Sequence, residues 1–193
     1  MDSLKRMAII IALIEKMAEE GSWCGETHIQ KATYFLQALA KVPLEYEFVI
    51  YKHGPFSFDF KDELSEMFGG ELITYFDRPY PYGPTLCPGE SAENFLKKFP
   101  VTLNKFGPHI NFIARHLGKK NVASLEKMGT ALFMMLKNEN KGVQELASDI
   151  NKLKPHVTVE EAERALLAVQ ALMSAFNSIA NSSNENTLIC STQ

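Results

Sequence analysis

Residues 46–57, Tyr-Glu-Phe-Val-Ile-Tyr-Lys-His-Gly-Pro-Phe-Ser, constrain the fold of this chain more than any other stretch. The first six alternate with the period of two that is typical of a strand, and aromatic and β-branched side chains are frequent among them. Gly54-Pro55 should then end the strand in a fixed turn, because glycine adopts backbone conformations closed to other residues and proline lacks an N–H. Ser57 can cap a following helix with its hydroxyl. We therefore expect a strand that reverses sharply into a helix.

Apolar residues three and four positions apart predict helices before and after this stretch. The helices expected in the first half span residues 3–20, 27–39 and 58–68. Thr27 and Gln30 have the spacing of a capping box, which would open the second of these helices. Short strands are expected at residues 72–76 and 85–87, on either side of a proline-rich loop. Helix, helix, strand, helix and hairpin is the order of elements in a winged helix, although this topology does not by itself imply DNA binding.

The second half of the sequence predicts helices only. They are expected at residues 91–99, 105–117, 122–136, 142–153 and 159–180. Pro108 would be tolerated only near the first turn of its helix. Thr158 and Glu161 have the spacing of a second capping box, at the start of the last helix. The sequence from Asn181 onward is rich in Asn and Ser and has no periodicity, which predicts a flexible tail.

The expected fold class is α+β, mostly α, in a single compact domain over residues 1–180. Its parts are a winged-helix-like segment at 1–99, a helical bundle at 100–180 packed against it, and a flexible tail at 181–193. Hydrophobic residues make up 46% of the chain and charged residues 22%, which is ordinary for a globular protein with a core. The apolar run near the start is too short to cross a bilayer and lacks a cleavage site. Together with three widely spaced cysteines, this predicts a cytoplasmic protein without membrane contact.

Charge is unevenly distributed along the chain. The net charge of −3 argues mildly against nucleic acid as the main partner. Residues 97–127 carry seven Lys and Arg against one acid, whereas residues 45–71 carry seven acids against two lysines. Solvated helix faces would explain this split. The alternative is a basic face that meets an acidic partner, with Arg115, Lys119 and Lys120 as contact residues.

The sequence contains no recognisable catalytic constellation. A nucleophile elbow, a Walker loop, a dinucleotide fingerprint and a zinc-protease helix are all missing. Cys24 and His28 are four apart, but no second Cys/His pair has ligand spacing, so neither a metal nor a cofactor is expected. His53 follows the predicted strand, where loop residues often carry function, or it hydrogen-bonds the turn and does nothing else. An enzyme centred on His53 is a third hypothesis, but one histidine without a placed partner cannot be assigned a catalytic role.

Aromatic residues suggest two kinds of site. Four surround the predicted strand: Tyr34, Tyr46, Tyr51 and Phe56. They could form a stacking surface for bases, although aromatics around a strand more commonly form core. Tyr80 and Tyr82 differ, because a proline-rich hairpin tip offers little core to bury them. We expect these two tyrosines to contact a protein partner.

Two segments carry a resemblance to a known family. Gln30-Lys31-Ala32-Thr33-Tyr34-Phe35-Leu36 resembles the Gln-Lys-hydrophobic-x-Tyr-Phe helix of the SocA-like antitoxin proteins, also called the Panacea domain, and of the related YwgA-like proteins. Phe48-x-x-Tyr51-Lys52-His53-Gly54-Pro55-Phe56-Ser57 resembles their Phe-x-x-Tyr-x-x-Gly-Pro-[Tyr/Phe/Val]-Ser signature. The likeness covers residues 4–99 and is closer to the YwgA-like branch. Leu153-Lys154-Pro155, with residues 160–165, resembles the C-terminal portion of those proteins. It implies an intracellular, non-enzymatic domain, in several relatives encoded with a toxin that it neutralises directly or presents to a protease.

We therefore expect a protein-binding module that resembles an antitoxin of a toxin–antitoxin or phage-defence system, with no enzymatic activity. The expected contact residues are His53, Phe56, Tyr80, Tyr82, Arg115, Lys119 and Lys120. Gly54, Pro55 and Ser57 would shape the turn. The alternative is a winged-helix transcriptional regulator that binds DNA. The helix at residues 58–68 would then be the recognition element, but it carries four acids against Lys61 and would repel phosphates. Such a regulator would have to use the basic residues 97–127 instead.

Overall fold

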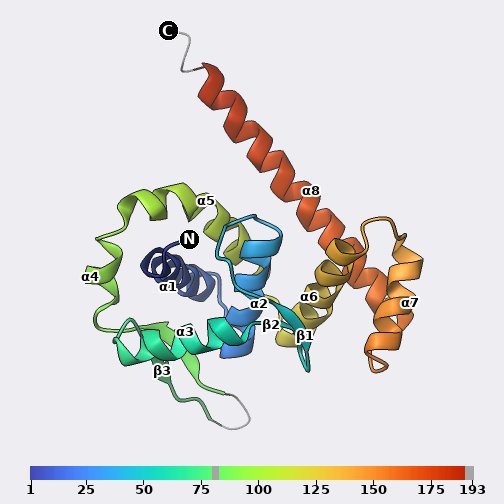
Figure 1. Cartoon of the computed structure of the whole chain (residues 1–193), viewed down its shortest axis with the longest axis horizontal. Helices are drawn as coiled ribbons and strands as arrows, with labels where there is room; N and C mark the ends of the chain where they lie inside the picture. The colour runs from blue at the N-terminus through green and yellow to red at the C-terminus, as the bar shows by residue number, and fades with distance from the viewer. Residues whose placement is uncertain (80–82, 190–193) are drawn as a thin grey trace.

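The computed structural model describes residues 1–79 and 83–189, with side chains as far as Ser178. Over these residues the chain forms eight helices and four strands, which confirms an α+β fold that is mostly α (Figure 1). The helices are α1 Ser3–Glu19, α2 Glu26–Ala38, α3 Phe58–Gly69, α4 Ala92–Leu96, α5 Pro100–Leu117, α6 Val122–Lys137, α7 Val143–Leu153 and α8 Val159–Ile189. The strands are β1 Val49–Tyr51, β2 Gly54–Phe56, β3 Ile73–Phe76 and β4 Thr85–Pro88.

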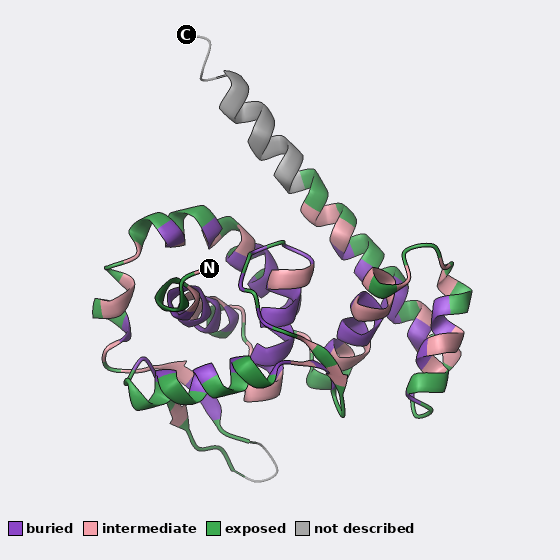
Figure 2. Cartoon of the chain, viewed as in Figure 1, coloured by how far each residue is buried: buried purple, intermediate pink, exposed green. Residues whose placement is uncertain are grey.

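Helix α1 is the centre of the fold. Its middle is apolar on every side, and a helix of that kind belongs in a core. Ile9, Ile10 and Ile11 are fully buried, whereas Leu4 in the first turn is 50% exposed. Buried positions predominate along this helix in Figure 2. Burial in the middle of α1 therefore extends around the helix and is not confined to one apolar stripe. Asp2 caps the helix by accepting hydrogen bonds from the N–H groups of the first turn.

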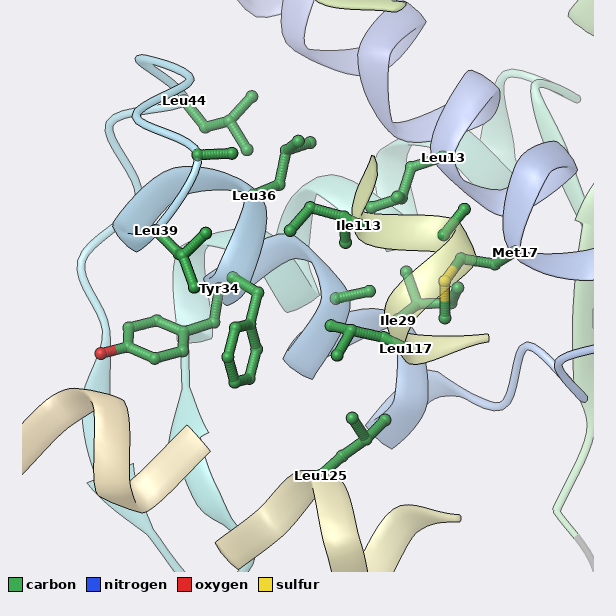
Figure 3. Close-up of a cluster of buried hydrophobic side chains, with 14 of the residues drawn as sticks. Leu13, Met17, Ile29, Tyr34, Leu36, Leu39, Leu44, Ile113, Leu117 and Leu125 are labelled. Atoms are coloured by element: carbon green, nitrogen blue, oxygen red, sulfur yellow. The ribbon is translucent and has the colours of Figure 1, made fainter. Parts of the chain in front are cut away.

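The core joins the two halves of the chain. Helix α5 packs along α1, and α2 contacts α1, α5 and α6. Figure 3 shows side chains from all four helices meeting in one cluster, with Leu13 from α1, Leu36 from α2, Ile113 from α5 and Leu125 from α6. Helices α7 and α8 pack on each other and on α6. Helix α2 therefore links the first half of the chain to the helices of the second half.

The strands form two separate antiparallel hairpins. In the first, Val49 lies opposite Phe56 and Tyr51 lies opposite Gly54, so the turn consists of residues 52 and 53. In the second, β3 pairs with β4. The order of elements is the predicted one except for β2, an additional strand that pairs with β1. The prediction that Gly54-Pro55 forms the turn is wrong: both residues lie in β2, a two-stranded edge where a proline without an N–H is tolerated.

The two predicted capping boxes have different outcomes. At α8, the Glu161 N–H donates to Thr158 Oγ1 at 3.2 Å, and the Thr158 N–H donates to Glu161 Oε2 at 3.1 Å, as predicted. At α2, the prediction is wrong. The helix begins at Glu26 after Gly25, which provides no side-chain cap, and Gln30 makes its hydrogen bonds elsewhere.

Two helices are longer than the sequence predicts. Helix α5 starts at Pro100 instead of residue 105, so Pro108 lies inside it rather than in its first turn. Pro100 itself occupies the start of the helix, where a missing N–H is harmless. Helix α8 continues to Ile189, past the predicted end at residue 180. None of the described helices is long and apolar enough to cross a membrane.

Candidate functional site

Two glutamines of α2 hold both ends of the segment 46–57. The Gln30 side-chain amide donates to the Ser57 carbonyl at 3.0 Å and accepts from the Ser57 N–H at 3.2 Å. Gln37 makes the same pair of bonds with the backbone of Tyr46, both at 2.9 Å. Residues seven apart lie on one face of a helix, so one face of α2 can reach both ends of the segment. The β1–β2 hairpin between these ends is thus fixed to α2.

Two buried lysines donate hydrogen bonds to backbone carbonyls of the hairpin. Lys31 of α2 is 1% exposed, and its Nζ donates to the Pro55 carbonyl at 2.8 Å. Lys154, which follows α7, donates to the Lys52 carbonyl at 3.1 Å and pairs with Glu126 of α6 at 2.7 Å. These bonds satisfy backbone carbonyls on the strand and at the turn, which would otherwise be costly to bury.

Glu126 of α6 is the carboxylate that pairs with the basic side chains next to the hairpin. Its other oxygen lies 3.4 Å from Nδ1 of His53, an exposed residue at the turn. Burial on its own would raise the pKa of Glu126, but hydrogen bonds and charge attraction from Lys154 and His53 hold that pKa below its usual value. The carboxylate is therefore charged at neutral pH and balances the lysines around it.

Burial lowers the pKa of Lys31 to about 8. The attraction of Glu126 opposes this shift, and the repulsion of Lys154 adds to it. The Lys31 amine is enclosed and hydrogen-bonded to a backbone carbonyl, so it is not placed to meet a substrate. Its arrangement serves to fix the hairpin backbone.

Two glycines allow β2 to lie directly against α6. Gly54 has a φ of +82°, in the left-handed region, and a Cβ there would lie 3.1 Å from the Glu126 carbonyl oxygen and 3.2 Å from Thr130 Oγ1. On the helix side, a Cβ at Gly129 would lie 3.0 Å from Cδ of Pro55. The close approach therefore depends on both glycines.

Three aromatic rings contact one another where the hairpin meets α3, and we name them the aromatic cluster: Tyr51 of β1, Phe56 of β2 and Phe58 of α3. The ring centroids are 5.8 Å apart for Tyr51 and Phe56, 5.7 Å for Tyr51 and Phe58, and 5.0 Å for Phe56 and Phe58. Tyr51 and Phe58 are each 55% exposed. A groove of about 380 Å³ runs beside Tyr51, between β1 and residues 153–156. Hairpin, rings and groove together form the candidate functional site.

No protein-family model matches this chain, and no curated protein is significantly similar to it. The geometry of the hairpin and its surroundings is therefore the main basis for assigning a function.

The predicted site residues fall in two places. His53 and Phe56 lie on the hairpin, Gly54 and Pro55 form β2, and Ser57 caps α3 by accepting from the Phe60 N–H at 3.2 Å. The basic residues lie elsewhere: Arg115 is exposed on α5, and Lys119 and Lys120, in the connection from α5 to α6, line a separate cavity. Tyr80 and Tyr82 lie outside the described residues. Among the side chains that the structure describes, no three His, Cys, Asp or Glu gather as a metal site.

Sequence reasoning missed several residues of this site. Tyr34 and Tyr46 are buried as predicted, but Tyr51 faces solvent. The alternation of residues in β1 could have indicated that Tyr51 is exposed, because Val49 and Tyr51 lie on the same face of the strand and both are exposed. Lys31 stands in the family-like motif, yet nothing local indicates that its amine is buried. Lys154 and Glu126 are distant in sequence, and only tertiary packing brings them to the hairpin.

Proposed function

We propose that the chain is a non-enzymatic protein-binding module whose contact surface is the aromatic cluster. The observation that carries this proposal is the exposure of Tyr51 and Phe58, each at 55%, on a backbone that α2 and α6 hold in place. Aromatic side chains are enriched in the centres of protein interfaces, where they bury large areas. A folded protein gains nothing from leaving such rings in water, so a partner that covers them is the simplest reason for their exposure.

The support beneath the rings favours binding. Gln30, Gln37 and Lys31 fix the hairpin backbone by hydrogen bonds before any partner arrives. A surface that is already ordered loses little conformational entropy on association. The contact between Phe56 and Phe58, at 5.0 Å, restricts these side chains in the same way.

Charges around the cluster indicate the chemistry of the partner. Asp59 and Asp62 are exposed at the start of α3, and Glu47 is exposed before β1. Lys52 and Lys61 are exposed on the same two segments, so the charge around the rings is mixed. A protein segment with an apolar anchor flanked by both acidic and basic side chains would match this surface. The groove beside Tyr51 could accept a side chain of that segment.

The resemblance to SocA-like and YwgA-like proteins supports a specific role. In that role the chain is a cytoplasmic antitoxin that neutralises a toxin or presents it to another protein. The Gln-Lys pair and the Gly-Pro-Phe-Ser element that carry the resemblance are in contact here, because Gln30 bonds Ser57 and Lys31 bonds Pro55. A motif whose two parts support one hairpin is consistent with a shared scaffold rather than a shared reaction.

Co-expression with the proteins encoded next to it tests the proposal. Wild type should co-purify with one neighbour and relieve any growth defect that this neighbour causes. Tyr51→Ser with Phe58→Ser should lose both effects while the thermal midpoint stays nearly unchanged. The matched control is Phe76→Ser with Val101→Ser, which removes exposed apolar side chains elsewhere on the surface. Equal capture by both double variants would contradict the proposal, as would unfolding of the first variant alone.

The same experiment can include Tyr80→Ala with Tyr82→Ala. These tyrosines are expected to contribute to partner capture with little effect on stability. Loss of capture in this variant alone, with the Tyr51 and Phe58 variant fully active, would place the contact surface at the later loop instead of the aromatic cluster.

DNA binding is the alternative function, and the charge on α3 argues against it. Asp59, Asp62 and Glu66 are exposed on that helix, so it would repel phosphates. A regulator would have to use Arg115, Lys119 and Lys120 instead. A salt titration of duplex binding separates the two functions, because affinity that depends on phosphate contacts falls steeply with salt.

A further inference from the structure

A cavity of about 760 Å³ lies apart from the aromatic cluster. Three segments line it: residues 21–28 around the start of α2, residues 118–123 between α5 and α6, and Arg78 with residues 83 and 84 from the connection of β3 to β4. Its volume is in the range of sites that enclose small molecules. The cavity therefore has room for a ligand of nucleotide size.

Buried contacts set the walls of this cavity. His28 is 5% exposed and lies 3.3 Å through Nε2 from the Leu117 carbonyl. Because a carbonyl only accepts, Nε2 carries the proton, and Nδ1 accepts from the Ser22 hydroxyl at 3.0 Å. A Cβ at Gly118 would lie 2.6 Å from Cβ of Glu20, so the end of α5 is packed closely against the end of α1. The cavity is thus built into the fold.

The lining is cationic in a protein of net charge −3. Arg78, Lys119 and Lys120 line the cavity, and Glu26 is the one acid among its described lining residues. The Leu117 carbonyl, which would repel an anion at the end of α5, is engaged by His28. The first turn of α2 adds backbone N–H groups that no side chain caps. These groups favour a ligand with negative charge.

An aromatic wall completes the cavity. Trp23 is 52% exposed, and the Arg78 guanidinium lies 5.8 Å from the centroid of its ring. Arg78 is itself positioned, because its Nε donates to Thr85 Oγ1 at 2.7 Å. An indole beside an oriented guanidinium can pack against a planar ring on the ligand.

We propose that this cavity binds a nucleoside phosphate. The base packs against Trp23 and Arg78, and the phosphates lie between Lys119, Lys120 and the first turn of α2. Two of the residues predicted from the sequence as protein contacts, Lys119 and Lys120, thereby take a different role. This binding is independent of the aromatic cluster, so either proposal can fail without the other.

Trp23 is the only tryptophan of the chain, so its fluorescence reports directly on the cavity. Full-length protein is titrated with ADP, adenosine and inorganic pyrophosphate at constant ionic strength, and calorimetry provides a second readout. ADP should change the emission saturably and bind more tightly than pyrophosphate or adenosine. Absence of a saturable change and of heat with ADP up to millimolar concentrations would overturn the proposal. If pyrophosphate bound as tightly as ADP, the base would contribute nothing to affinity, and its proposed packing against Trp23 and Arg78 would be overturned.

Charge variants complete the test. Lys119→Gln with Lys120→Gln should raise the Kd for ADP at least about tenfold, as expected for the loss of charge-assisted hydrogen bonds. Lys98→Gln with Lys105→Gln makes the same change of net charge at exposed positions outside the cavity, and should change the Kd less than about twofold. Equal weakening in both variants would mean general electrostatic attraction and would contradict a site.

Discussion

Gln30 and Ser57 are 27 positions apart in the sequence and are joined by two hydrogen bonds, from the Gln30 amide to the Ser57 carbonyl at 3.0 Å and from the Ser57 N–H to the Gln30 carbonyl at 3.2 Å. Both residues are fully buried. A primary amide can replace a neighbouring strand in this way, because it presents one donor and one acceptor as a peptide group does. Ser57 also caps α3, so the side chain of Gln30 sets where the hairpin ends and where α3 begins.

Gln30→Leu should destabilise the protein strongly. The substitution leaves the buried Ser57 N–H without its partner, which costs about 1–3 kcal/mol. The Ser57 carbonyl loses one hydrogen bond, worth about 0.5–1.5 kcal/mol, but still accepts from the Lys61 N–H at 3.2 Å. The expected loss in the free energy of unfolding is therefore about 2–4 kcal/mol, measured by urea denaturation. Gln170→Leu, on the exposed face of α8, is the control and should change stability by less than about 0.5 kcal/mol. A small effect at Gln30 would mean that Ser57 finds other partners, for example water.

Gly54→Ala should destabilise the protein by about 2 kcal/mol or more, because the residue has a φ of +82° and a Cβ would press on the backbone of α6. Gly69→Ala provides the control at the end of α3: no neighbouring group lies within 4 Å of a Cβ there, and alanine favours helix. That variant should be neutral or more stable by up to about 1 kcal/mol. The thermal midpoint should fall only for Gly54→Ala, and an equal fall in both variants would contradict the close contact of β2 with α6.

Lys31 should make stability depend on pH in the alkaline range. Its pKa of about 8 in the folded protein lies below the ordinary value of 10.5, so the unfolded chain holds more protons between these values and stability rises with pH across that window. The rise is up to about 3 kcal/mol, since one pKa unit corresponds to about 1.4 kcal/mol. Lys31→Met lacks this contribution, so its free energy of unfolding, measured from pH 7 to 11, should rise less across the window. Parallel curves for the two proteins would contradict a buried, charged Lys31.

Tyr46→Phe should cost about 1–2 kcal/mol, because the buried Tyr46 hydroxyl donates to Glu63, whose other oxygen accepts from Ser3 and Arg6. Tyr51→Phe removes the same atom from a side chain that is 55% exposed and should change stability by less than about 0.5 kcal/mol. Chemical denaturation of both variants tests the difference. Equal losses of stability in both variants would contradict a stabilising hydrogen bond from the buried Tyr46 hydroxyl to Glu63.

Local patterns predicted most of the helices and the hairpin at β3 and β4. The capping box at Thr158 and the cap at Ser57 formed as predicted, because a cap depends only on residues three positions away. The cap at Thr27 did not form. The N-cap of α2 is Gly25, two residues before Thr27, and the Gln30 side chain hydrogen-bonds the buried backbone of Ser57 instead. A tertiary contact here overrides a local preference of similar strength.

The sequence by itself determined the helical periods, the hairpin of β3 and β4, and the importance of segment 46–57. Only the tertiary structure decided that Gly54-Pro55 pairs as a strand, that Tyr51 faces solvent, and that Lys119 and Lys120 line a cavity with Trp23. The physical reason is the distance in sequence over which each interaction acts. Periodicity and capping act within a few residues, whereas the hydrogen bonds of Lys154 to Lys52 and of Gln30 to Ser57 join groups that only the packed helices bring within reach.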